Sequence, residues 1–381
     1  MSRSSCRVLL FALTAVAPRL LAQTPPAETP QQPAPPQPVP TPTPEPTPTP
    51  APAPVAPAGS SKVFNPDMAV IGDFLAAAGR NRTDNPPPSF ELHEAELSLQ
   101  AVVDPYARAD FFFSYSPEGA EVEEGFITFT SLPGKLLLKA GKLRAGFGKV
   151  NTQHTHILPW TDRPLVTQNL LGGDEGIADA GLSLARLLPI GSTFLEATAE
   201  VYRGESGVFR APQRSDLSYV GRLRGYRDIT ESTNFELGSS IAYGHNGITD
   251  DTTTQLYGVD ATFRWRPLRR AIYRRLLARS ELVWSRAEKQ SGANESFGAY
   301  VSSEYQFARR WFAGARFDVS GRAYEDVPKD KGGSLLLTFW PSEFSQVRGQ
   351  YRYTKLGTGE TNNEFLFQLL FSIGAHGAHT F

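Results

Sequence analysis

The sequence has almost no cysteine, no long apolar run beyond its N-terminus and no excess of charge of either sign. Cys6 is the only cysteine among the 381 residues, which excludes a disulfide framework and a multi-cysteine metal site. No run of about 18 apolar residues follows the N-terminus, which excludes a protein that crosses a membrane with helices. The formal net charge of −1 provides no basic face, so nucleic acid is not an expected partner.

The N-terminal segment has the pattern of a cleaved export signal. Arg3 and Arg7 precede an apolar run at residues 8–17, and Ala22 is a small residue before the expected cut. A retained anchor is the less favoured alternative, because about ten apolar residues are too few to span a bilayer. We therefore expect residues 1–22 to be a signal peptide.

The next segment is rich in proline. Sixteen of the 31 prolines lie between residues 24 and 58, where they alternate with Thr, Ala and Gln. This composition cannot build a packed core and favours a solvated polyproline II spacer. We expect residues 23–61 to be a disordered linker in the periplasm. A structural anchor that links the outer membrane to the cell wall through this linker is an alternative function.

The remaining residues, 62–381, contain many short stretches in which apolar and polar side chains alternate. In the clearest case, one face carries Tyr257 and Val259, and the other carries Asp260 and Thr262. A period of two indicates strands with two different faces. Every proline after Pro66 falls in an expected connection, since proline cannot donate to a strand ladder. The sixteen expected strands span residues 68–77, 91–103, 106–116, 122–131, 135–146, 177–187, 193–202, 217–226, 233–243, 255–266, 276–287, 297–307, 311–320, 334–340, 345–354 and 364–373.

The two faces favour a membrane barrel over a soluble sandwich. The apolar faces end repeatedly in aromatic residues, as at Trp265, Trp284 and Tyr353, which is typical of an interfacial girdle. The polar faces are dense in charge, and an open sheet edge cannot exist in lipid. Phe381 continues the phase of the last strand, which resembles the signal read by the barrel-assembly machinery. The sequence therefore predicts an all-β fold, a transmembrane antiparallel β-barrel of about 16 strands in outer-membrane lipid.

A barrel of this size predicts a channel. Sixteen strands enclose water, so we expect a porin of the bacterial outer membrane for passive diffusion of small polar or anionic solutes. No cofactor is expected. Catalysis is not expected either, because no GxSxG or HExxH motif occurs, and His93 and Ser98 lie too far apart along one strand for direct contact.

Three stretches carry a family resemblance. They are FNPDMAVIGDF at residues 64–74, LKAGKLRAGFGK at 138–149 and PWTDRPL at 159–165. On these motifs the chain resembles the phosphate-selective porin O and P family, whose members are sixteen-stranded outer-membrane porins. The resemblance implies a homotrimer, and it implies that the third external loop folds into the pore. The family's phosphate channels are lined by many lysines and arginines, whereas this sequence has no lysine ladder beyond residues 138–149.

Assignment of the polar faces predicts a lumen with charges of both signs. Acids lie mostly on early strands and arginines on later ones, an arrangement that would create a field across the pore. The alternative is a mixed set of ion pairs, such as Arg279 with Glu281 or Asp260 with Arg264. The predicted pore-lining residues are Glu94, Glu96, Glu124, Lys139, Lys142, Arg144, Glu196, Glu200, Arg222, Arg224, Arg264, Arg266, Arg279, Arg316, Arg348 and Arg352.

The longest connection, at residues 147–176, is the expected constriction. Trp160, Asp162 and Arg163 are its candidate residues. His154 and His156 in the same loop are two residues apart, so their imidazoles point the same way on an extended chain. They are candidate ligands for a divalent ion, although a closed zinc site takes about four ligands. A metal-ion (zinc) uptake channel is therefore a second alternative function.

Overall fold

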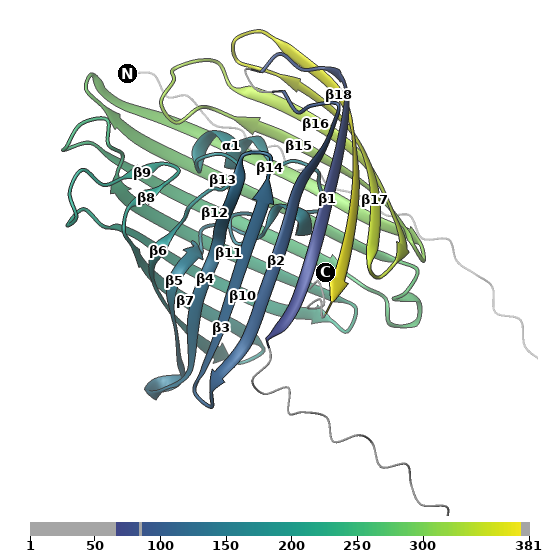
Figure 1. The fold of residues 1–381 in the computed structure, drawn as a ribbon, viewed down its shortest axis with the longest axis horizontal. Helices are drawn as coiled ribbons and strands as arrows, with labels where there is room; N and C mark the ends of the chain where they lie inside the picture. The colour runs from purple at the N-terminus through teal and green to yellow at the C-terminus, as the bar shows by residue number, and fades with distance from the viewer. Residues whose placement is uncertain (1–65, 84–85, 375–381) are drawn as a thin grey trace, which may run out of the picture. The chain divides into compact units, whose positions relative to one another are not determined.

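The alternating segments form sixteen long antiparallel strands that close into a barrel (Figure 1). The computed structural model describes residues 66–83 and 86–374, so the expected signal peptide, the Pro-rich linker and Phe381 lie outside the described residues. The barrel strands are β1 (Asp67–Arg80), β2 (Phe90–Asp104), β3 (Ala107–Ser116), β4 (Gly119–Leu132), β5 (Leu136–Arg144), β6 (Ala178–Ile190), β7 (Thr193–Tyr202), β10 (Ser218–Thr230), β11 (Thr233–His245), β12 (Thr253–Trp265), β13 (Arg275–Lys289), β14 (Gly292–Ala308), β15 (Trp311–Ser320), β16 (Asp330–Ser342), β17 (Ser345–Lys355) and β18 (Thr361–Gly374).

Each barrel strand pairs with its neighbours in sequence, and the first pairs with the last. Val70 of β1 lies opposite Ile373 of β18, which closes the sheet and leaves it without a free edge. All sixteen predicted strands are confirmed, and several extend beyond their predicted ends. The expectation that proline avoids every strand is wrong at Pro189 and Pro341, each the next-to-last residue of its strand. A missing N–H is tolerated there because the ladder is ending.

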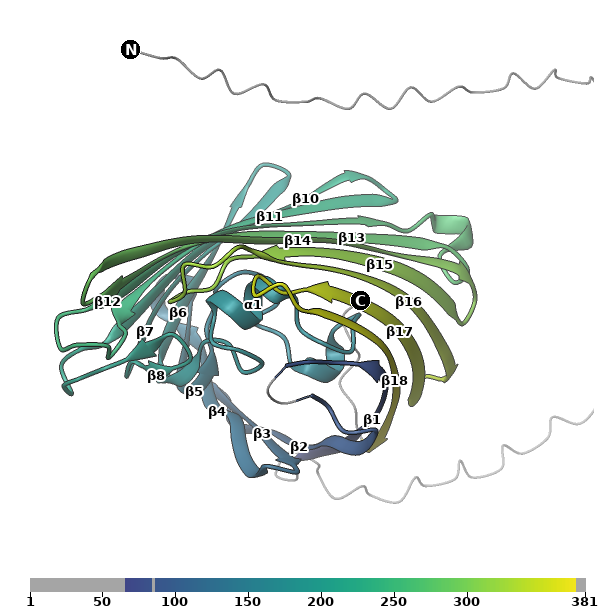
Figure 2. The same ribbon diagram turned by 90° about the horizontal axis from the view of Figure 1, so that it is seen from above.

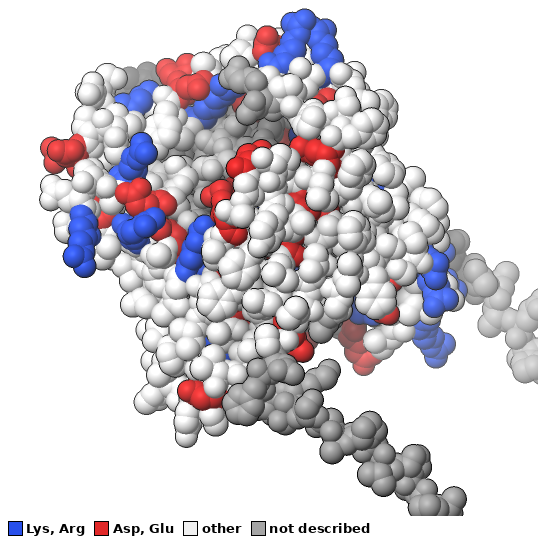
Figure 3. All heavy atoms as spheres, in the orientation of Figure 1, with Lys and Arg blue, Asp and Glu red and all other residues white. Residues whose placement is uncertain are grey.

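The polar face of the strands is the buried one. In β12, Asp260 and Thr262 are each 1% exposed, whereas Tyr257 on the other face is 50% exposed. A soluble sandwich would bury the apolar face instead, so this pattern confirms the barrel interpretation. On the side of the molecule shown in Figure 3, charged residues gather near the two ends, and the surface between them is largely uncharged. Across the described ranges, no helix is long and apolar enough to cross a membrane.

The long connection between β5 and β6 lies inside the ring of strands (Figure 2). It contains the 3-10 turn η3 (Thr155–Ile157) and the short helix α1 (Leu165–Leu170). The connection between β7 and β10 carries a small hairpin, β8 (Glu205–Ser206) and β9 (Phe209–Arg210). Two further 3-10 turns, η2 (Pro133–Lys135) and η4 (Leu268–Arg270), lie in the short connections.

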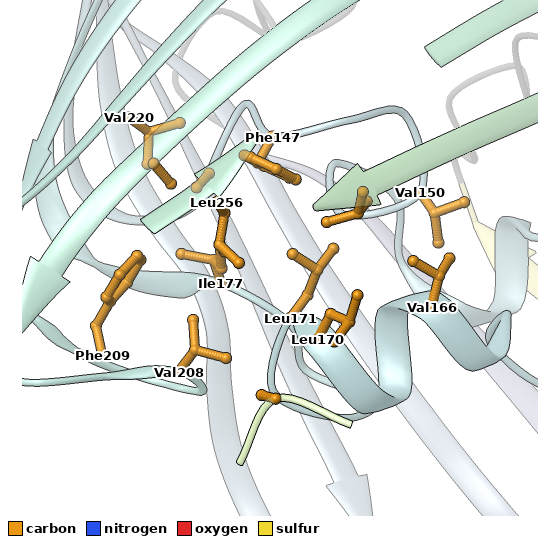
Figure 4. Close-up of a cluster of buried hydrophobic side chains, with 14 of the residues drawn as sticks. Phe147, Val150, Val166, Leu170, Leu171, Ile177, Val208, Phe209, Val220 and Leu256 are labelled. Carbon is orange, nitrogen blue, oxygen red and sulfur yellow. The ribbon is translucent and has the colours of Figure 1, made fainter. Parts of the chain in front are cut away.

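An apolar core lies inside the barrel and holds this inner loop. Phe147 and Leu170 of the loop are fully buried, in the same cluster as Val220 and Leu256 on the inner face of the barrel wall (Figure 4). Phe209 of the β8–β9 hairpin joins them. Each buried side chain of this size contributes about 1.5–3 kcal/mol, so the cluster makes the inner loop a fixed part of the structure.

Candidate functional site: the constricted lumen

The inner loop, residues 145–177, crosses the lumen and is hydrogen-bonded to the barrel wall on several strands. Its backbone amides donate to wall carboxylates: Gly146 N to Glu200 of β7 at 2.7 Å, and Val150 N to Glu281 of β13 at 2.7 Å. Leu165 N donates to Asp318 of β15 at 3.2 Å. These acids therefore satisfy loop amides that would otherwise be buried without a partner.

Asp162 connects the loop to the arginine-rich wall. Its carboxylate accepts hydrogen bonds from Arg316 of β15 at 2.8 Å and from Arg352 of β17 at 3.0 Å. Gln350 donates to it at 2.5 Å. Burial alone would raise the pKa of Asp162, but Arg316 and Arg352 outweigh that effect and lower it to about 2. Asp162 is therefore an ionised cross-link at the constriction.

Trp160 and Arg163 have structural roles in the loop. Trp160 is 2% exposed and packs edge-on against Tyr300 of β14, with ring centroids 5.2 Å apart. Arg163 is fully buried and donates to the backbone oxygens of Val150 at 3.2 Å and Gln153 at 2.8 Å. Arg163 is a candidate constriction residue, and its guanidinium satisfies carbonyls of the constriction loop itself.

His154 and His156 lie against an acidic part of the wall. His154 Nδ1 is 2.8 Å from Glu96 Oε2 and 2.9 Å from Glu123 Oε2, and its Nε2 is 2.9 Å from Glu124 Oε2. His156 Nδ1 is 3.6 Å from the same Glu96 oxygen. Burial disfavours the imidazolium, but the three carboxylates raise the pKa of His154 well above its ordinary value. Without a metal ion, the carboxylates therefore favour a proton on His154.

Most of the predicted pore-lining arginines are ion-paired in the lumen. The pairs are Arg222–Asp260 at 2.9 Å, Arg224–Glu196 at 3.1 Å, Arg264–Glu236 at 3.3 Å, Arg316–Asp318 at 2.7 Å and Arg352–Glu364 at 2.5 Å. The arrangement therefore follows the alternative of mixed ion pairs more closely than that of two opposed walls. The partners differ from the examples expected: Asp260 pairs with Arg222, not with Arg264.

Two arginines differ from the rest. Arg279 is 7% exposed, and its Nε and Nη1 have no hydrogen-bond partner among the described residues. Arg348 is 2% exposed and donates to Gln368 at 2.8 Å, an amide and not a carboxylate. Both line a cavity of about 260 Å³ beside the inner loop, together with Glu304. This cavity offers guanidinium groups to a solute.

The predicted lysines do not form one lining. Lys139 lies on the lumen side, 4.6 Å from the ring centroid of Phe126. Lys142, three residues further along β5, is partly exposed and pairs with Glu121 of β4 at 3.1 Å. Its place in the lining stays a prediction. Arg266 is misplaced, since it is exposed in the turn that follows β12.

Arg144 ends β5 and pairs with Glu123 at 2.7 Å. Alternation alone does not place Glu123 in the lumen, because a β-bulge shifts the register of β3 and β4: Phe112 lies opposite Glu124, whereas Phe113 lies opposite Val122. The extra residue, Glu123, is turned towards the lumen beside Glu124. The adjacent acids Glu123 and Glu124 were the visible signal, but alternation alone assigns them to opposite faces.

Comparisons with solved structures place this fold in a class. The anion-selective porin from Comamonas acidovorans matches with a TM-score of 0.58 at 10% identity, covering 81% of this chain and 99% of that chain. The outer-membrane channel DcaP of Acinetobacter baumannii has a TM-score of 0.54 at 12% identity, covering 81% and 96%. OmpT of Vibrio cholerae, in its trimer form, has a TM-score of 0.54 at 9% identity, covering 81% and 99%. The chain thus has the fold of the sixteen-stranded outer-membrane porins.

A protein of Aquifex aeolicus (strain VF5), described as uncharacterized, is 31% identical over 390 aligned residues, covering 84% of this chain and 81% of that one. The chain belongs to the same family as this Aquifex protein. No family model matches the chain.

Proposed function

We propose that this protein is a porin of the bacterial outer membrane that lets small polar or anionic solutes diffuse passively across it. The observation that carries the proposal is a closed barrel of sixteen strands whose interior is charged and whose outer face is apolar, narrowed by an inner loop. Barrels of this size enclose water, and an apolar outer band suits them to lipid. The similar barrels from Comamonas acidovorans and Acinetobacter baumannii, a porin and a channel, support the same function.

The unbalanced arginines support a preference for anions. Arg279 and Arg348 line a cavity whose other charged lining residues are Arg275, Glu304 and Glu343. The other lining arginines named above each have a carboxylate partner within 4.0 Å, so their charges are largely compensated. An anion that passes this cavity meets guanidinium groups whose charge is only partly neutralised.

The proposal also includes the finer features implied by the family resemblance. We propose a relationship to the phosphate-selective porin O and P family through residues 138–149 and 159–165, which supply β5 and the constriction. A homotrimer is part of this proposal. An apolar groove on the outer face, lined by Ala76, Leu335 and Phe365, is a candidate contact between subunits. Cross-linking in detergent should give a trimer band, and a monomer alone would contradict this part.

The proposed function is tested by conductance. The mature protein is refolded and inserted into a planar bilayer, with different salt concentrations on the two sides. Stable stepwise conductance is expected, with a reversal potential of the sign that anions give. A folded, heat-modifiable protein that inserts but never conducts would refute the porin function, and a cation-selective potential would refute the role given to Arg279 and Arg348.

A further inference from the structure

The acidic part of the wall forms a buried cluster with the two histidines of the inner loop. Glu94 and Glu96 project from β2, and Glu123 from the bulge in β4, towards the two histidines. One ligand atom from each of Glu96, Glu123 and His154 lies within 4.8 Å of the others. The same holds for Glu94, Glu96 and His156, so Glu96 belongs to both groups.

The geometry at His154 is that of a metal ligand. Its Nε2 lies 2.9 Å from Glu124 Oε2, the position from which a metal-bound histidine donates its other N–H to an outer carboxylate. A neutral ring that donates from Nε2 presents a lone pair at Nδ1. That nitrogen faces carboxylate oxygens of Glu96 at 2.8 Å and Glu123 at 2.9 Å. Ligand atoms bonded tetrahedrally to one ion at about 2.0–2.2 Å lie about 3.3–3.6 Å apart, so an outward shift of about half an ångström would admit the ion between these atoms.

Burial makes these contacts costly without a cation. Glu96 is 2% exposed, Glu94 is 8% exposed and His154 is 7% exposed. Within the described parts of the chain, Glu96 Oε2, Glu94 Oε1 and His154 Nδ1 are all buried without a hydrogen bond of good geometry. In the protein alone, a single proton on His154 Nδ1 lies between carboxylate oxygens of Glu96 and Glu123, and buried acceptors that lack a donor of their own are strongly disfavoured. A metal ion in place of that proton would bind all three groups at once.

The charge of the cluster points the same way. Four carboxylates, those of Glu94, Glu96, Glu123 and Glu124, surround the histidines, and Arg144 is the arginine that is ion-paired with them, through Glu123 at 2.7 Å. With both imidazoles neutral, the state in which histidine binds a metal, the formal charge of this group is −3. A divalent cation would reduce it to −1 and replace the missing hydrogen bonds with metal–ligand bonds.

We propose that Glu96, Glu123 and His154 bind a divalent transition-metal ion of the Zn²⁺ class, with Glu94 and His156 grouped around Glu96 to complete its coordination. Imidazole with carboxylate is a donor set that suits zinc, and a site made of carboxylates alone would suit magnesium or calcium instead. Because the ligands come from β2, β4 and the inner loop, the ion links the constriction to the acidic wall. Asp162 links the same loop to the arginine wall.

The test uses the full mature chain and ZnCl₂ alone. After exposure to zinc and dialysis, metal analysis is expected to find one tightly held zinc per chain, and calorimetry is expected to show much weaker binding of Mg²⁺. Glu96→Gln should lower the zinc affinity at least about tenfold, since loss of an outer-shell partner alone costs about 10–100-fold. Glu121→Gln is the matched control, because Glu121 is an exposed acid of β4 that pairs with Lys142.

A second pair of variants tests the histidine. His154→Gln should weaken zinc binding, whereas His245→Gln, in a histidine that contacts the backbone of Asp250, should not. His376 and His379 remain in every variant, so any zinc that they bind is the same throughout. No retained zinc, equal affinity for Mg²⁺, or Glu96→Gln binding as well as Glu121→Gln would each overturn the proposal.

The wild type alone gives an independent readout if a variant fails to fold. X-ray absorption at the zinc edge should show nitrogen and oxygen ligands with the outer-shell signature of imidazole. Zinc with a shell of water only would overturn the proposal. The proposal is independent of what the pore conducts, because a channel that conducts and binds no zinc refutes the metal site and leaves the porin function intact.

Discussion

Replacement of Asp162 by asparagine is the sharpest test of how the constriction is held. The variant keeps the shape of the side chain but replaces the carboxylate, which accepts hydrogen bonds from Arg316 at 2.8 Å and Arg352 at 3.0 Å, with a neutral amide. Loss of one partner from a buried ion pair costs about 3–5 kcal/mol. The lower end applies here, since Arg316 keeps Asp318 and Arg352 keeps Glu364.

The pKa gives a second route to the same magnitude. The pKa of Asp162 is about 2, below the value of 3.8 for an ordinary aspartate. This difference corresponds to about 2 kcal/mol in favour of the ionised, docked state. If the free energy of loop docking becomes less favourable by about 2–3 kcal/mol, the equilibrium constant for docking falls by a factor of about 30–150. Asp162→Asn should therefore give larger or noisier single-channel conductance and a shift towards anion selectivity.

The control is Asp174→Asn, which makes the same charge change in the same loop, at an exposed residue. In planar bilayers, Asp174→Asn should behave like the wild type. If Asp162→Asn and Asp174→Asn have the same conductance, noise and reversal potential, Asp162 does not hold the constriction and the reasoning fails.

The lowered pKa of Asp162 also fixes the sign of a pH dependence. A group whose pKa is lower in the folded state stabilises that state above its ordinary pKa, and the stabilisation is lost as the pH falls through the folded value. The contribution of Asp162 is thus complete above about pH 4 and falls as the pH approaches 2. Channel noise should rise in this window in the wild type and change less in Asp162→Asn. An equal rise in both would assign the effect to other carboxylates.

Two further perturbations test the charge and the packing of the lumen. Arg279→Gln should lower the anion-to-cation permeability ratio several-fold. A unit charge about 8 Å from a passing ion, at an effective dielectric constant of about 20, contributes about 2 kcal/mol before screening. The control variant Arg266→Gln, in the exposed turn, should leave the reversal potential unchanged. Gly172→Ala should lower the temperature of heat modification on gels more than Gly173→Ala does. Both glycines have positive φ, so both variants carry backbone strain. Only a Cβ at Gly172 would also meet a neighbouring atom, Gly207 Cα at 2.3 Å. Equal effects of the two alanines would show that this close approach contributes nothing.

Strand positions and barrel closure could be predicted because period-two alternation persists over long segments. β12 shows why: Tyr257 faces outwards and Asp260 inwards, as their parity requires. The same parity places Leu256 in the lumen, where alternation gives no reason for an apolar residue. Its role becomes clear only with Phe147, a loop residue that packs in the same cluster.

The constriction could be predicted by its position but not by its contacts. Length singled out the loop, and Asp162 does face the arginine wall. Arg163 is adjacent in sequence but is folded into the loop, because a connection of irregular backbone must satisfy its own carbonyls. The helix α1 has six residues, too few to show a helical period. The bulge at Glu123 depends on the register of β3 against β4. This register cannot be predicted from the alternation of side chains within each strand.

These contacts lead to a view of selectivity that differs from a count of lumen charges. Glu200 and Glu281 accept hydrogen bonds from loop amides, and Asp162 is shared by two arginines, so these acids are occupied in holding the constriction. A metal ion at His154 would neutralise much of the acidic wall in the same way. What remains for a solute is the charge left without a close partner, and Arg279 is the clearest example. The ions that pass are then determined by the residues that the inner loop leaves unpaired, not by the near balance of acids and bases in the chain.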